Sequence, residues 1–226
     1  RVAVLMGNRV EWLTTYFAAV AIGAEVVALN ILATARELAY QLTHAEVDVL
    51  VFEPKYRDRD FVVILADAAR EHGLDPLPKY IPVDDVPPGA MSFTDLVEYG
   101  ARIDDDMLVA AQRAIEPGDT ACILYTSGST ALPKGVPLYH SGLIDNMWSI
   151  GERQHLTPDD RLWLAVSLFW SYAGVNALFT MMTHGASIVL QHHFEPGEAL
   201  RLIEQERCTV FYGTPALSRP MWEHPD

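Results

Sequence analysis

The stretch ACILYTSGSTALPKGV, residues 121–136, joins an apolar run to a loop rich in hydroxyl groups and glycine. Its first part, residues 121–126, has the composition of a buried strand. The second part combines serine, threonine and glycine and ends in Pro133-Lys134-Gly135, so it cannot form the interior of a strand or helix. Because ligands of parallel sheets bind beyond the carboxyl ends of the strands, this order predicts a binding loop at a strand end.

Strand-like and helix-like runs alternate on both sides of this stretch. The expected strands are 2–6, 25–30, 47–53, 79–85, 120–126, 135–140, 162–167, 186–191 and 208–213. The expected helices are 13–20, 35–45, 61–68, 92–100, 104–113, 141–153, 174–184, 197–206 and one that begins at Pro215. This alternation predicts an α/β fold of layered, mainly parallel sheets flanked by helices. Strands covered on both faces are apolar throughout, as these are.

Local signals mark several ends and one boundary. Thr34 and Glu37 have the spacing of a capping box, and Gly73 can end the helix before it. The segment LTPDDR, residues 156–161, is the best linker. We therefore expect a first α/β subdomain over 1–156, which contains the loop and the following helix, and the start of a second over 157–226.

Composition excludes several classes of protein. A net charge of −14 argues against a general binder of nucleic acid or membrane surfaces, because both reward basic patches. No apolar run approaches the length of about 18 residues that a membrane helix needs, so we expect no stable membrane insertion. Cys122 and Cys208 lack metal-site spacing and are expected to be buried free thiols, which fits a reducing cytoplasm. Sequence leaves the oligomeric state open, with a homodimer among the options.

The loop has the parts of a polyphosphate cradle. Gly128 and Gly135 permit close backbone approach, and backbone N–H groups in such a turn can bind an anion. Lys134 adds a positive charge in a chain with three lysines. The hydroxyl donors are Thr126, Ser127, Ser129 and Thr130. A polar surface turn is the alternative, but a Pro-Lys-Gly ending directly after a buried strand favours the cradle.

This is not a Walker P-loop, although Gly128 and Lys134 have the right separation. Pro133 replaces the second glycine of that motif and removes an N–H group from the cradle. Gly135 stands where a Mg²⁺-binding Ser or Thr is needed, and the residues after it look extended rather than helical.

The loop resembles the signature of the adenylate-forming superfamily, which includes acyl-CoA synthetases, peptide-synthetase adenylation domains and luciferases. That signature is close to Y-T-S-G-S/T-T-G-x-P-K-G-V, and only Ala131 departs from it, in place of a glycine. The resemblance covers essentially the whole chain, because the segments upstream of the loop, LFWSYAGV and the stretch from ASIVLQ to TPAL also look like their counterparts in these enzymes. It implies an incomplete large N-terminal domain of that fold.

The resemblance also implies a chemistry and its cofactors. The family activates a small carboxylic acid with ATP and Mg²⁺ and passes the acyl group to a thiol, usually of coenzyme A or a carrier-protein pantetheine. Lys134 and Thr126 would be the catalytic residues, and Thr126 would also contact the metal ion. The implied nucleotide-binding residues are Thr126, Ser127, Gly128, Ser129, Thr130, Ala131, Leu132, Pro133, Lys134 and Gly135.

Five further residues are implied to border the acyl site. Trp170 stands where the family commonly has histidine, and Tyr172 is a second wall candidate. Gly213, Thr214 and Pro215 match a strand-end turn beside the site. Two alternatives remain: Trp170 packs in the core, or Thr214-Pro215 only begins a helix.

The later motifs of the family are absent, so we interpret the chain as an N-terminal fragment that folds at least partly but does not turn over. The alternative is a noncatalytic nucleotide- or acyl-binding module on the same scaffold. His192-His193 lacks a partner pair at helical spacing and is not expected to bind metal. Sequence does not identify the acid or choose between coenzyme A and a carrier protein.

Overall fold

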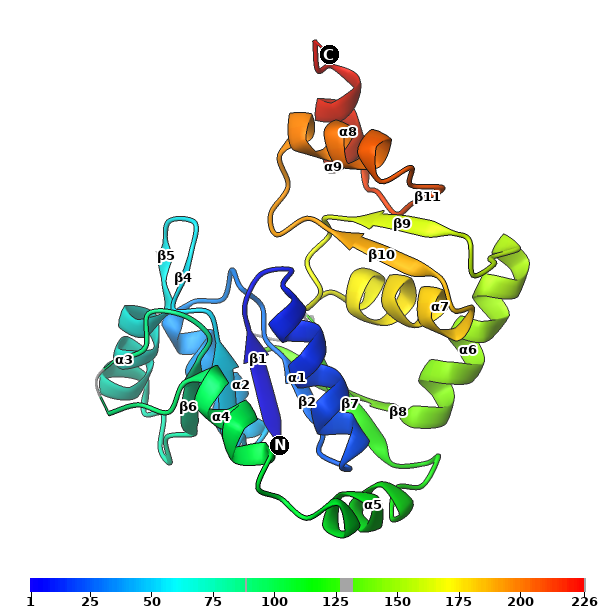
Figure 1. Cartoon of the computed structure of the whole chain (residues 1–226). Helices are drawn as coiled ribbons and strands as arrows, with labels where there is room; N and C mark the ends of the chain where they lie inside the picture. The colour runs from blue at the N-terminus through cyan, green and yellow to red at the C-terminus, as the bar shows by residue number, and fades with distance from the viewer. Residues whose placement is uncertain (88, 127–131, 226) are drawn as a thin grey trace. The chain divides into compact units, whose positions relative to one another are not determined.

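The computed structural model describes residues 1–87, 89–126 and 132–225 of the chain. They divide into two compact units, described separately below (Figure 1). The first unit comprises Arg1–Met6 and Val10–His140, and the second comprises Gly7–Arg9 and Ser141–Asp226. Among the described residues, no helix has both the length and the apolar character needed to cross a membrane.

A six-stranded sheet forms the first unit, in the order β6-β3-β1-β2-β7-β8. All neighbouring strands are parallel except β7 and β8, which are antiparallel. The strands are β1 (Val2–Leu5), β2 (Val26–Ala28), β3 (Val49–Phe52), β6 (Lys79–Pro82), β7 (Thr120–Thr126) and β8 (Lys134–Tyr139). The strands β1, β2 and β3 are buried almost throughout, which explains why their sequences are apolar without alternation.

The helices of this unit are α1 (Val10–Ala21), α2 (Ala35–His44), α3 (Phe61–His72), α4 (Phe93–Gly100) and α5 (Asp105–Arg113). Helix α1 packs on β1 and β2 and buries Trp12 and Tyr16 in stacked contact, with ring centroids 5.2 Å apart. The expected capping box of Thr34 and Glu37 is present at the start of α2, and Gly73 ends α3 in the left-handed conformation. A small hairpin of β4 (Lys55–Tyr56) and β5 (Arg59–Asp60) was not expected from sequence.

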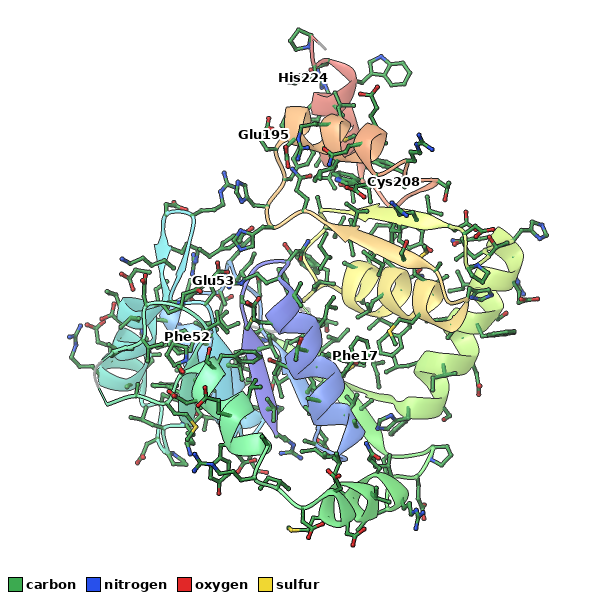
Figure 2. All side chains as sticks on the ribbon, in the orientation of Figure 1. Phe17, Phe52, Glu53, Glu195, Cys208 and His224 are labelled. Carbon is green, nitrogen blue, oxygen red and sulfur yellow. The ribbon has the colours of Figure 1, made fainter. Side chains whose placement is uncertain are left out.

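The second unit contains a three-stranded parallel sheet in the order β10-β9-β11. The strands are β9 (Arg161–Leu164), β10 (Ser187–Leu190) and β11 (Val210–Phe211). The helices are α6 (His140–Gln154), the π-helix η1 (Ser171–Ala177), α7 (Leu178–Thr183), α8 (Pro196–Gln205) and α9 (Pro215–Trp222). Trp163 and Ala199 lie at the centre of the core of this unit. The half-buried Cys208 side chain, labelled in Figure 2, packs against this core.

Helix α6 falls in the second unit, whereas the sequence places it at the end of the first, over 1–156. Its contacts explain the difference. The Thr180 hydroxyl of α7 contacts Met147 Sδ at 3.6 Å, and the Trp148 ring stacks on His184 at 4.8 Å. Gly151 lies so close to His184 that an added Cβ atom would be 2.2 Å from its ring.

Candidate functional site

The first candidate region, in the first unit, is the loop end of the β7–β8 hairpin. Thr126 ends β7, Lys134 begins β8, and the two residues are directly paired and exposed. Directly paired residues of antiparallel strands extend from the same face of the sheet. The Thr126 hydroxyl and the Lys134 ammonium can therefore reach one ligand. The other predicted cradle residues Ser127, Gly128, Ser129, Thr130 and Ala131 lie outside the described residues.

The neighbouring pair, Tyr125 and Gly135, holds this hairpin in place. A Cβ atom on Gly135 would lie 3.2 Å from Ile123 Cγ2 and 3.5 Å from Tyr125 Cζ, so the tyrosine ring packs close to the glycine. The Tyr125 hydroxyl lies 2.8 Å from His44 Nδ1 and donates to the Gln41 carbonyl oxygen at 3.3 Å. Burial raises the pKa of Tyr125 to about 12, so its hydroxyl remains a donor at neutral pH. The hairpin is thus anchored to α2.

The geometry differs from that of a Walker motif. There, a helix begins directly after the loop and contributes its N-terminus to phosphate binding. Here, the residues from Lys134 to Tyr139 are a strand, as the sequence predicts. Leu132 is 42% exposed and, with Tyr40, His44 and other residues, lines an open hollow beside α2, while Pro133 is half-buried. Any phosphate held here is bound by a hairpin rather than by a helix end.

A separate candidate region lies in the second unit, at the carboxyl edge of its sheet. Trp170 follows β9 and is 50% exposed, so the alternative that it packs in the core is wrong. Its ring lies 4.8 Å from that of Phe169, whose side chain is buried. Trp170 is the N-cap residue of η1, and its carbonyl oxygen accepts from the backbone N–H groups of Ala173 and Gly174. The aromatic segment after β9 therefore buries Phe169 and presents Trp170.

Two tyrosines connect this region to the turn after β11. Tyr172 stacks on Tyr212 with ring centroids 5.3 Å apart, and its hydroxyl donates to the Gly213 carbonyl oxygen at 3.4 Å. Gln154 Nε2 in turn donates to the Tyr212 hydroxyl at 2.8 Å. The structure thus brings together Tyr172 and Gly213 of the predicted set. Tyr212 was missed, although an aromatic residue directly before Gly213 is a signal that sequence could have used.

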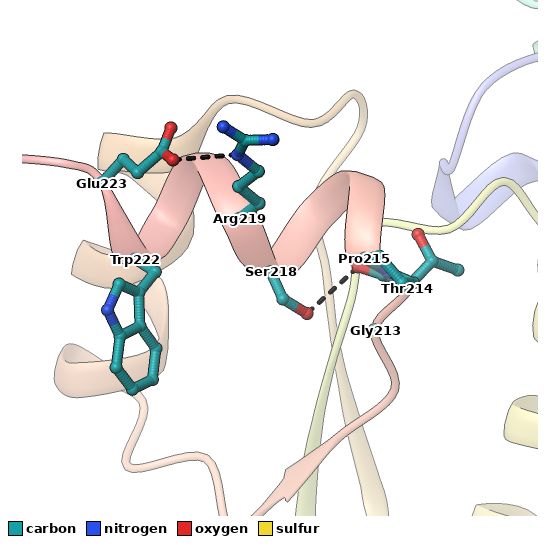
Figure 3. Close-up of a pocket in the computed structure, with 7 residues that line it drawn as sticks. All are labelled: Gly213, Thr214, Pro215, Ser218, Arg219, Trp222 and Glu223. Atoms are coloured by element: carbon teal, nitrogen blue, oxygen red, sulfur yellow. Dashed lines mark hydrogen bonds and ion pairs between the residues drawn. The ribbon is translucent and has the colours of Figure 1, made fainter.

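The turn after β11 borders an open cavity of about 520 Å³ (Figure 3). Its lining residues are Gly213, Thr214, Pro215, Ser218, Arg219, Trp222 and Glu223. Pro215 occupies the first turn of α9, and the Thr214 side chain makes no capping bond to it. The Thr214 carbonyl oxygen instead accepts from Ser218 Oγ at 3.0 Å. Helix initiation by Pro215 is therefore confirmed, and the Thr214 hydroxyl is left for other partners.

The described residues do not form a metal centre of the histidine, cysteine and carboxylate type. None of their histidine, cysteine and carboxylate side chains group in sets of three or more that could hold a metal ion. The rings of His192 and His193 are 5.7 Å apart and edge-on. The predicted contact of Thr126 with Mg²⁺ involves a hydroxyl oxygen and stays a prediction.

A mainly parallel sheet with a hairpin at the carboxyl end of one strand, followed along the chain by a second parallel sheet, places these units in the α/β class of domains. The chain belongs to the AMP-binding enzyme family, whose model matches residues 1–226. The family and the fold class expected from sequence are both confirmed.

Several relatives carry the name of acyl-CoA ligase or acyl-CoA synthetase. The chain is 32% identical to "Acyl-CoA ligase sidI" of Beauveria bassiana over 96% of its own length and 37% of that protein. It is 28% identical to "Putative acyl-CoA synthetase YngI" of Bacillus subtilis, over 100% of its own length and 43% of that protein. The chain therefore spans well under half the length of these relatives.

Solved structures of other proteins have a similar fold. Apo MatB from Rhodopseudomonas palustris superposes with a TM-score of 0.73 at 29% identity, over 100% of this chain and 41% of that one. The N-terminal domain of FACL13 from Mycobacterium tuberculosis gives a TM-score of 0.74 at 25% identity, over 100% of this chain and 52% of that one.

Proposed function

We propose that this chain is the N-terminal part of an ATP-dependent ligase that activates a small carboxylic acid and transfers it to a thiol, with coenzyme A as the acceptor. The hairpin that pairs Thr126 with Lys134 carries the proposal, because it places a hydroxyl and an ammonium at the open end of a glycine-rich loop. The names of the acyl-CoA ligase relatives support the reaction class.

The described residues fit a polyphosphate. In a chain with a net charge of −14, an anion needs a local positive charge, and Lys134 supplies it. Gly135 lets the hairpin backbone approach closely, since its missing side chain leaves room for Ile123 and Tyr125. Lys134, Thr126 and the loop residues between them would hold the nucleotide, with Thr126 also contacting Mg²⁺.

Bound Mg·ATP supplies the α-phosphate that the carboxylate attacks and a pyrophosphate leaving group. Lys134 would neutralise charge that develops on the leaving oxygens, which is the form of catalysis that a fixed cation performs well. Tyr125 would contribute indirectly and would not touch the nucleotide. Its bond to His44 fixes the end of the strand from which Thr126 extends. The protein mainly positions groups and forms no covalent bond itself.

We assign the acid to the carboxyl edge of the second sheet. Trp170 and the stacked pair of Tyr172 and Tyr212 provide flat aromatic surface. Indole in place of the imidazole that the family commonly has at position 170 is bulkier and does not titrate, so we expect flat or small acids. The protein is expected in the cytoplasm and not on nucleic acid.

The competing proposal is a noncatalytic nucleotide- or acyl-binding module on this scaffold. It is favoured by Ala131 in place of the signature glycine and by Trp170 in place of histidine. Only the first proposal predicts pyrophosphate release by the protein that contains this chain.

The test is Mg·ATP binding by equilibrium dialysis with the parent chain, Lys134→Ala and the control Lys55→Ala, which removes an exposed lysine from β4. We expect Lys134→Ala to weaken binding about tenfold or more, because a charge-assisted bond is lost, and Lys55→Ala to bind like the parent. Equal binding by all three would refute the cradle. Pyrophosphate release with a panel of carboxylic acids, measured on the full-length protein, then separates ligase from module.

A further inference from the structure

Asn8 is a buried amide that the proposed mechanism does not use. It follows β1 in the chain but belongs to the second unit, and it is 4% exposed. Its Nδ2 donates to the carbonyl oxygens of Val166 at 3.0 Å and Gln191 at 3.3 Å. Its Oδ1 accepts from the Leu168 backbone N–H at 2.9 Å. Asn8 therefore bonds to two segments that lie more than 150 residues away in the sequence.

The pattern of these bonds has a specific meaning. Val166 and Leu168 lie on either side of Ser167, in the bend and turn that follow β9. The Asn8 amide donates to the carbonyl oxygen of the first residue and accepts from the N–H of the second. One side chain therefore pairs with the backbone at both ends of this short segment and holds its conformation.

The Asn8 backbone and Gln191 extend this network across the sheet edge. Asn8 N–H donates to the His192 carbonyl oxygen at 3.3 Å, so the same residue also holds the segment after β10. The Gln191 side chain accepts from Trp163 Nε1 at 3.2 Å and donates to the Glu195 carbonyl oxygen at 3.0 Å. Buried polar groups that are bonded at every donor and acceptor fix one arrangement of their surroundings.

The segment that Asn8 holds is the one that presents Trp170. Leu168 and Phe169 are buried, while Trp170 is half exposed and its N–H donates to the Ser167 carbonyl oxygen at 3.0 Å. A shift of the backbone at Val166–Leu168 would therefore move the Trp170 ring. We propose that Asn8 is a positioning residue for the carboxylate site, which sets the place of the aromatic wall and so the preference between flat and linear acids. This inference rests on the proposed function.

Hydrogen exchange tests the contact without any ligand. Asn8→Ala removes both donors and the acceptor, so we expect faster amide exchange in peptides that cover 166–170. The control Thr180→Val removes a buried hydroxyl of α7 in the same unit, and we expect parental exchange at 166–170. Parental exchange at 166–170 in Asn8→Ala would overturn the proposal.

A second variant covers the case in which Asn8→Ala does not fold. In Asn8→Asp, a carboxylate can accept from Leu168 but cannot donate to Val166, whereas a protonated carboxyl group can do both. We expect faster exchange at 166–170 at pH 8 and near-parental exchange at pH 5. The parent protein is measured at both pH values as the reference, because His192, which accepts from the Asn8 backbone N–H, is present in both proteins. If the ratio of the Asn8→Asp exchange rate to the parental rate is the same at pH 5 and pH 8, the result counts against a hydrogen-bonded side chain at position 8.

Binding of probe acids tests the positioning role. Dissociation constants for benzoate and hexanoate, a flat and a linear probe, are measured for the parent, Asn8→Ala and Thr180→Val. We expect Asn8→Ala alone to change the ratio of the two constants, by about threefold or more on the scale of one lost hydrogen bond, with Mg·ATP binding unchanged. Faster exchange with an unchanged ratio would overturn the positioning role. If the parent binds neither acid, the proposed carboxylate site fails, and the exchange data alone decide whether Asn8 holds the segment.

Discussion

Gly213 is a position where the size of one side chain decides the packing. A Cβ atom there would lie 2.1 Å from Cε1 and 2.3 Å from Cζ of Phe211. The Phe211 side chain is 45% exposed, so its ring can move toward solvent, but this movement weakens its stacking on Trp163, where the ring centroids are 5.3 Å apart at an interplanar angle of 4°. We expect Gly213→Ala to lower the free energy of unfolding by about 1–3 kcal/mol, the usual cost of overpacking, as measured by urea unfolding.

The same substitution at Gly142 is the control for Gly213→Ala. Gly142 lies in α6, and nothing within 4 Å would meet its added Cβ atom. Alanine in a helix interior is favoured over glycine by about 0.5–1 kcal/mol, so Gly142→Ala should be neutral or slightly stabilising. Comparable stability changes in the two variants would show that the Phe211 contact does not limit position 213.

At the scale of elements, the β7–β8 hairpin depends on its contact with α2. Tyr125→Phe keeps the ring but removes the hydroxyl that meets His44 and Gln41. We expect a loss of about 1 kcal/mol of stability, typical of one net hydrogen bond, and severalfold weaker Mg·ATP binding in the dialysis assay. The control is Tyr99→Phe, in α4, where the side chain is 54% exposed. Parental Mg·ATP affinity in Tyr125→Phe would mean that the anchor does not position the loop.

Elements whose signals are local were predictable. The capping box of Thr34 and Glu37, the left-handed Gly73 and the extended segment after Lys134 each follow from a few neighbouring residues. The two-residue strands of the β4–β5 hairpin were not, because they are too short to show periodicity and their turn places Arg57 at a φ of 55°. The π-helical start of η1 was missed for a similar reason, since helical periodicity does not distinguish its hydrogen bonding.

The candidate site residues also differ in whether a local sequence signal marks them. Lys134, Thr126 and Trp170 could be proposed from sequence because a loop composition or a short motif surrounds them. The proposed roles of Asn8 and Tyr212 depend on partners 40 to 183 positions away, which no local pattern contains. Tyr212 meets Gln154 and Tyr172, and Asn8 meets Val166 and Gln191, only after the second unit has folded.

At the scale of the whole molecule, burial makes the chain sensitive to alkaline pH. Burial raises the pKa of Cys122 from 9.0 to about 11 and that of Tyr125 from 10.0 to about 12. The pKa of Tyr16, which contacts Cys122, is raised as well, chiefly by burial. Each of these groups is neutral in its protonated form, and the chain already carries a charge of −14 at pH 7. Losing these protons adds negative charge inside an acidic protein.

The sign of the effect follows from the two pKa values of Cys122. Below pH 9 the thiol is protonated in both states and its stabilising contribution is fully present. As pH rises from 9 through 11, the unfolded chain releases the proton before the folded chain does, so the folded state loses stability. A single group of this kind changes the free energy of unfolding by at most about 1.4 kcal/mol per pH unit.

Cys122→Ala should therefore flatten the decline of stability between pH 9 and 11, even though it removes a buried group and lowers stability at pH 7. The measurement is the urea unfolding midpoint at pH 7, 9, 10 and 11. Cys208→Ala is the matched control: burial raises the pKa of this thiol as well, but the side chain is only half-buried, so its removal should flatten the slope less than Cys122→Ala does. If Cys122→Ala and the parent lose stability at the same rate above pH 9, the buried thiol is not a source of the alkaline sensitivity, and the tyrosines alone must account for it.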